Sequence, residues 1–165
     1  MEPTLSGQTT LNVVEKMDEL DRILDEYEVK HGIKDFKCED IDPYLSLTRN
    51  ELSKMSASDC GEVAFLIERT SLYIQKLINK ETARINWAET SMEFLIADKL
   101  NNYGGQYATY QEKKNAAIKD NSVCCKYMNV KVNAQKVVDR MSYLPQRLNS
   151  LAKTLESLQQ SKRRA

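Results

Sequence analysis

VCCKYMNVKVNAQKVVDRMSYLPQRLNSLAKTLESL, residues 123–158, is the stretch that decides the fold. Its apolar residues recur at alternating spacings of four and three, the heptad pattern that places them on one helix face. They are Val123, Tyr127, Val130, Ala134, Val137, Met141, Leu144, Leu148, Leu151, Leu155 and Leu158. Pro145 removes a backbone donor while the phase continues, so we expect a kink or short break between two collinear helices.

A second helical tract runs from Ser56 to about residue 102 without proline. Core positions recur every eleven residues, at Val63, Ile74, Ile85 and Ile96, which predicts a helix of over 40 residues with a nearly straight apolar stripe. Glu81 falls inside that stripe and needs a partner there. The two glycines in NNYGG, residues 101–105, permit a reversal. The two tracts are therefore predicted to form a helical hairpin.

The N-terminal part predicts a separate helix and a connector. A helix should begin after Thr9 or Thr10 and end at Gly32, because Val13, Met17, Leu20, Leu24 and Tyr27 share one face. Residues 33–47 have no sustained period. Thr48 with Glu51 and Ser56 with Asp59 match capping boxes that begin further helices. We thus expect an all-α protein with two parts. Residues 1–47 form an acidic helix and a connector, and residues 48–165 form the hairpin and the heptad helix.

Composition supports helices and separates the charges. Five glycines and three prolines in 165 residues are too few for an all-β protein. The net charge is zero, but residues 1–62 carry 7 basic and 15 acidic side chains, whereas residues 101–165 carry 12 and 4. A basic half favours an anionic partner such as nucleic acid. Alternatively, the acidic end packs on the basic end.

No catalytic or metal site is predicted, and no cofactor. The single histidine, His31, directly precedes the glycine that ends the first helix, and we interpret it as a solvated cap residue. Cys38, Cys60, Cys124 and Cys125 lack metal-ligand spacing and are interpreted as reduced thiols. No apolar stretch reaches the roughly 18 residues that span a bilayer. We expect a cytoplasmic protein, in the host cytoplasm if the source is viral, that is not an enzyme.

A basic and aromatic stripe is the candidate nucleic-acid interface. It consists of Arg69, Tyr73, Lys76, Lys80, Arg84 and Trp87, which share a face of the long helix away from the isoleucines. Tyr103, Tyr107, Tyr110, Lys113 and Lys114 follow at the reversal, and Lys162, Arg163 and Arg164 end the chain. Cations meet phosphates and rings stack on unpaired bases. The alternatives are that Tyr73 and Trp87 lie under another helix, that the tyrosines pack the hairpin, and that the tail aids solubility.

This layout, with a basic and aromatic helix, a Tyr103-Gly104-Gly105 reversal and a second amphipathic tract, resembles phage recombination mediators of the UvsY type over residues 63–158. The resemblance implies a ring-like homo-oligomer that binds single-stranded DNA. It also implies loading of a recombinase onto strands coated by single-strand-binding protein.

The leading hypothesis is a non-enzymatic, oligomeric protein that binds single-stranded nucleic acid through the 69–87 face. Assembly would use Val137, Met141, Leu144, Leu148, Leu151, Leu155 and Leu158. One rival is a structural or adaptor protein, such as a virion component or scaffold. Another is a small regulator that contacts a protein partner through the acidic first helix. Exposure of Tyr73 and Trp87 distinguishes these hypotheses.

Overall fold

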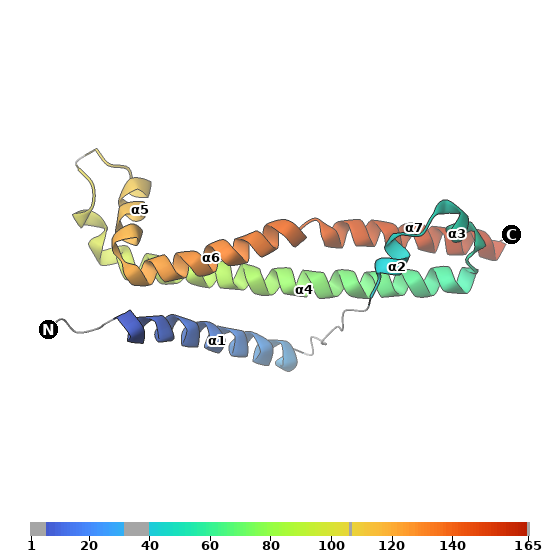
Figure 1. The fold of residues 1–165 in the computed structure, drawn as a ribbon, viewed down its shortest axis with the longest axis horizontal. Helices are drawn as coiled ribbons and strands as arrows, with labels where there is room; N and C mark the ends of the chain where they lie inside the picture. The colour runs from blue at the N-terminus through green and yellow to red at the C-terminus, as the bar shows by residue number, and fades with distance from the viewer. Residues whose placement is uncertain (1–5, 32–39, 106, 165) are drawn as a thin grey trace. The chain divides into compact units, whose positions relative to one another are not determined.

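A computed structural model describes residues 6–31, 40–105 and 107–164, with side chains from Val13 onward. The helices are α1 (Ser6–Lys30), α2 (Asp42–Leu45), α3 (Arg49–Lys54), α4 (Ala57–Ile96), the 3-10 helix η1 (Ala97–Asn102), α5 (Tyr110–Asp120), α6 (Ser122–Met141) and α7 (Leu144–Arg164) (Figure 1). No strand occurs in the described residues, so the prediction of an all-α fold is confirmed. None of these helices has an apolar run long enough to cross a membrane.

Capping boxes begin three of the helices. The Thr48 hydroxyl accepts from the Glu51 amide and the Glu51 carboxylate accepts from the Thr48 amide, as the sequence predicted. Ser56 and Asp59 make the same reciprocal pair at the start of α4. Thr109 begins α5 with a third box. In each case the side chains satisfy amide groups that have no partner within the helix.

Helix α4 is uninterrupted over 40 residues and is followed by η1, so the predicted long helix is confirmed (Figure 1). Of the four positions in the eleven-residue repeat, Val63, Ile85 and Ile96 are buried and Ile74 is half-buried. Glu81, which the sequence left in need of a partner, is bonded by Arg84 one turn later.

The chain reverses after η1 at the predicted glycine pair. Gly104 has a φ of +80°, a backbone conformation that only glycine adopts without strain. Helix α5 then ends at Asp120, and the Asn121 side chain accepts from the Val123 and Cys124 amides to begin α6. The chain is therefore interrupted between α5 and α6 at Asn121.

Three boundaries differ from the expectation or refine it. Helix α1 begins at Ser6, so Thr9 and Thr10 lie inside the helix and the predicted start there is wrong. The connector contains a short helix, α2, whose first turn includes Pro43, a residue suited to that position because its missing N–H would have no helical partner. The interruption near Pro145 falls between Met141 and Leu144, because proline is tolerated in the first turn of α7. Gly32 and most of the connector lie outside the described residues.

The contacts group the chain into two units that cut across the division at residue 47. One unit contains α1 with Lys80–Val138, and the other contains Lys34–Asn79 with Asp139–Ala165. Each has its own core.

In the first unit, the core brings α1, α4, α5 and α6 together. Its buried residues are Val13, Ala88, Met92, Ile96, Ala117, Ile118, Cys124 and Tyr127. Trp87 contacts Tyr127, whereas Glu81, earlier in α4, lines a groove with Val137, later in α6. This order shows that α4 and α6 run antiparallel, as the predicted hairpin requires.

The core of the second unit joins α4 and α7, with Ile41 beside them. Its buried residues are Ile41, Val63, Ala64, Ile67, Leu148, Ala152 and Leu155. The buried Ser71 hydroxyl donates to the Pro145 carbonyl at 3.1 Å, so this polar group is satisfied within the core.

The heptad positions pack largely within the chain. Tyr127, Ala134, Leu148 and Leu155 are buried. Met141, Leu144, Leu151 and Leu158 are half-buried, and Val137 is exposed. Of the residues that the sequence assigned to assembly between chains, Leu148 and Leu155 are therefore buried in the core that α7 shares with α4. Oligomerisation through these residues stays a prediction.

Candidate nucleic-acid interface

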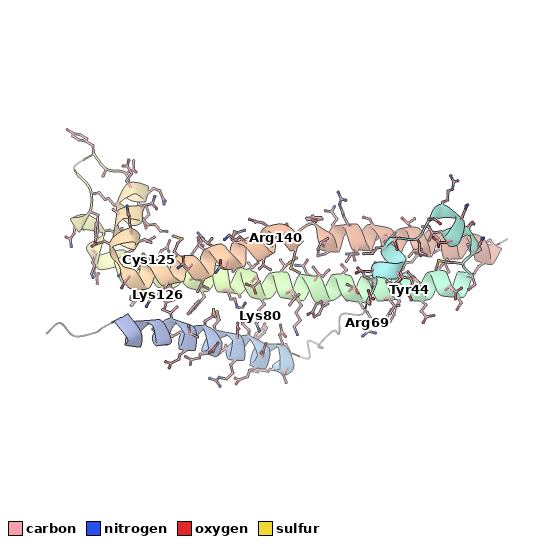
Figure 2. The ribbon with its side chains drawn as sticks, viewed as in Figure 1. Tyr44, Arg69, Lys80, Cys125, Lys126 and Arg140 are labelled. Carbon is pink, nitrogen blue, oxygen red and sulfur yellow. The ribbon has the colours of Figure 1, made fainter. Side chains whose placement is uncertain are left out.

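In the first unit, acidic residues of α1 meet the predicted basic stripe. Arg84 donates from Nε to Asp21 Oδ1 at 3.2 Å and from Nη2 to Asp21 Oδ2, a two-pronged pairing. Lys80 Nζ donates to Asp25 Oδ1 at 3.3 Å (Figure 2). The bond to Asp21 is the main cause of a raised pKa for Arg84. Two of the four predicted stripe cations thus already hold carboxylates.

Trp87, in the same unit, is half-buried. Its ring meets that of Tyr127 edge-on, with centroids 5.1 Å apart and planes at 69°. The indole also packs against the first core. Trp87 therefore does not present a free face to a base in this arrangement.

The remaining stripe residues belong to the second unit. Arg69 holds its guanidinium 5.7 Å from the centroid of the Phe65 ring, and Phe65 is exposed. Arg69, Tyr73 and Lys76 are all half-buried. With Trp87 and Tyr73 both partly covered, the 69–87 face resembles a helix-contacting surface more than an open stacking platform.

The three tyrosines of the reversal differ in how far they are buried. Tyr103 packs against the first core, and its hydroxyl donates to Asp120 Oδ2 at 2.7 Å, which raises the pKa of Tyr103. Tyr107 and Tyr110 are instead 93% and 61% exposed. The prediction that hairpin packing uses all three rings holds for Tyr103 alone.

Two lysines accompany these rings. Lys113 is half-buried, and its stem lies about 3.3 to 3.7 Å from the Cβ position of a residue replacing Gly104. Lys114 donates to Glu93 at 2.6 Å, and this bond raises the pKa of Lys114 and lowers that of Glu93. Lys113 is therefore placed beside the turn, whereas the charge of Lys114 is already balanced.

The basic tail has a structural role in part. Lys162 donates to the carbonyl oxygens of Ser53, at 2.7 Å, and of Met55. A cation at the C-terminal end of a helix satisfies carbonyls and opposes the helix dipole. Lys162 thus completes α3, while Arg163 and Arg164 are exposed.

One exposed basic and aromatic pair was missed. Arg147 of α7 holds its guanidinium 5.7 Å from the centroid of the Tyr143 ring, which is 54% exposed. The signal in the sequence was the absence of any acidic residue between Asp139 and Glu156. The heptad pattern of the same segment drew attention to its opposite face.

Within the described residues, no group of three or more His, Cys, Asp or Glu side chains could hold a metal ion. Cys60 and Cys124 are buried free thiols and Cys125 is an exposed one, while Cys38 lies outside these residues (Figure 2). Burial is the main cause of a raised pKa for Cys124.

Comparisons with protein-family models, with curated proteins and with solved structures gave no match to this chain. The functional argument therefore depends on the residues and their contacts.

Proposed function

We propose that the chain is a non-enzymatic helical protein that binds single-stranded nucleic acid at the reversal between η1 and α5. The observation that carries the proposal is the exposure of Tyr107 and Tyr110 in the segment where the Lys113 side chain lies against Gly104. A large ring that is exposed at a turn lacks the stabilisation that burial gives to other aromatic residues. Such a ring can stack on a base, whatever the sequence of the strand.

Stacking should supply most of this binding. Residues 97–120 contain four basic side chains, Lys99, Lys113, Lys114 and Lys119, against three acidic ones, Asp98, Glu112 and Asp120. Electrostatic attraction at the reversal is therefore small, although the whole segment 101–165 carries 12 basic and 4 acidic residues. The resemblance to UvsY-type mediators supports assigning this binding to DNA recombination in a phage, with recombinase loading as its purpose.

The test is fluorescence anisotropy with a labelled single-stranded oligothymidylate at several salt concentrations. Replacing Tyr107 and Tyr110 by alanine should cost about 1 to 3 kcal/mol per stacked base, with little change in salt dependence. Lys113→Ala should weaken binding less and should reduce the salt slope.

The matched control replaces both tyrosines by phenylalanine, which keeps the rings and removes the hydroxyls. This variant should bind like the wild type. If the alanine variant also binds like the wild type, or if the wild type shows no affinity for the strand at about 50 mM salt, the proposal fails.

A structural or adaptor role is the second candidate, and one observation favours it. Phe94 is 85% exposed at the edge of a groove of about 520 Å³ that Val13, Trp87, Leu95 and Tyr127 also line. Exposed apolar surface of this kind is typical of protein contacts. A structural role predicts self-association, so Phe94→Ser should lower the mass measured by light scattering. A wild type that is monomeric at micromolar concentration would argue against self-assembly as the role.

A further inference from the structure

Helix α1 is the most acidic helix of the first unit. It contains seven acidic and three basic residues. Asp21 and Asp25, one turn apart, pair with Arg84 and Lys80, one turn apart on α4. The order of these pairs shows that α1 runs antiparallel to α4. The acidic helix thus lies along two of the cations that the sequence assigned to nucleic acid, Lys80 and Arg84.

Those ion pairs and a small apolar contact attach α1 to the first unit. Among its described side chains, only Val13 is buried, whereas Met17, Leu20 and Leu24 are half-buried. Ile23, Tyr27 and Val29 are exposed. Helix α1 therefore buries little apolar surface, and the partly exposed Lys80–Asp25 pair is of the kind that salt weakens.

The surface beneath α1 has the groups that bind a nucleic-acid strand. Lys80, Arg84 and Trp87 lie within two turns of α4, at spacings of four and three residues. Arg84 already grips a carboxylate with two nitrogen atoms, and the same fork fits a phosphate. Release of α1 would expose Lys80 and Arg84 on this face, with Arg84 still bonded to Glu81 and Trp87 still packed on Tyr127.

We propose that α1 is a displaceable acidic cover, and that single-stranded nucleic acid competes with Asp21 and Asp25 for Lys80 and Arg84. This inference rests on the proposed function, since it adds a second contact for the strand that the reversal captures. If binding first requires removal of α1, the apparent affinity is the intrinsic affinity multiplied by the fraction of molecules in which α1 is displaced.

Nucleic acid fits this surface better than an acidic helix of another protein. Such a helix would offer the same carboxylate chemistry as α1, which is joined to the chain and so has a high effective concentration. A strand adds two contributions that α1 lacks, namely counterion release from its phosphates and stacking of its bases.

Trp87 reports on the cover directly. It is the only tryptophan in the chain. Val13 and Lys16 of α1 line the same groove as the indole. Displacement of α1 should therefore expose the indole to water and move its emission to longer wavelength.

The experiment titrates single-stranded oligothymidylate into the full chain and measures both anisotropy and Trp87 emission. Asp21→Asn with Asp25→Asn should bind about tenfold more tightly than the wild type, because the covered fraction falls. The control is Asp18→Asn with Glu19→Gln, which makes the same change in charge at two exposed positions of α1. It should leave the affinity unchanged.

A third variant adds Lys80→Ala and Arg84→Ala to the Asn pair, and it should lose the gain. Wild-type emission should shift as oligothymidylate binds. Equal affinity of the wild type and the Asn pair, or an equal gain in the control, overturns the cover while leaving the proposed function in place. Absence of binding by every variant overturns the proposed function itself. If polyglutamate shifts Trp87 emission and oligothymidylate does not, the nucleic-acid assignment of this surface is overturned in favour of an acidic helix.

Discussion

Gly104 and Gly105 stand side by side, but the structure requires glycine at only one of them. A Cβ at Gly104 would meet Ala108 Cβ at 2.5 Å, and its φ of +80° is strained for other residues. We expect Gly104→Ala to lower the free energy of unfolding by about 1 to 2 kcal/mol, as left-handed backbone does for residues with a Cβ. Gly105→Ala, with open space around its Cβ position, should change it little. Urea unfolding of the two variants measures both, and equal losses would contradict the assignment.

The adjacent thiols Cys124 and Cys125 should react at different rates. Cys124 is fully buried and its pKa is raised, so little thiolate forms near neutral pH. Cys125 is exposed. We expect iodoacetamide to label Cys125 first, with mass spectrometry of the peptides as the measurement. Equal labelling rates of the two thiols in urea would show that folding causes the difference. Equal labelling rates in the native protein would contradict the prediction.

At the scale of helices, the three capping boxes link stability to pH. Hydrogen bonds from Thr48, Ser56 and Thr109 lower the pKa values of their partners, Glu51, Asp59 and Glu112. A carboxylate whose pKa is lower in the folded state stabilises it above the ordinary pKa, and that stability is lost as pH falls.

The ordinary values are 4.5 for the two glutamates and 3.8 for the aspartate. The melting temperature should therefore be flat near neutral pH and decline from about pH 4.5 downward. Replacing the three carboxylates by their amides should make the decline shallower. An unchanged pH profile in that triple variant would contradict the role of the boxes.

Helix α7 contributes part of its heptad stripe to the second core. Leu155 is buried in the second core, so Leu155→Ala should cost about 2 to 5 kcal/mol of stability. Leu158→Ala, at a half-buried position of the same stripe, should cost less. Thermal unfolding compares them. A change in oligomer mass without a stability loss at Leu155 would show instead that the stripe joins separate chains.

The helices were predictable where the signals were local. The Thr48 and Ser56 boxes involve residues three apart, and the eleven-residue repeat from Val63 to Ile96 stays within one helix. The sequence could not show which helix would cover each stripe, because the heptad pattern of α7 is satisfied equally well by α4 or by another chain. For the same reason it could not show that Trp87 would pack on Tyr127, 40 residues later.

Across the whole molecule, part of the charge separation in the sequence becomes pairing in space. Asp21 and Asp25 pair with Lys80 and Arg84, from the segment in which charges are balanced. Basic residues of α6 and α7 stay exposed, such as Arg140, which Figure 2 labels, and Arg147. The proposed capture site consequently lies at the reversal, whereas the centre of α4 is the surface on which the acidic helix lies.

The position of Lys162 also bears on the order in which the molecule is made. Its partners, the carbonyls of Ser53 and Met55, are synthesised 109 and 107 residues earlier. A ribosome adds about 5 to 20 residues per second, so α3 waits roughly 5 to 20 seconds for its cation. During that interval the second core also lacks α7, which leaves the apolar face of α4 open to chaperones or to neighbouring nascent chains.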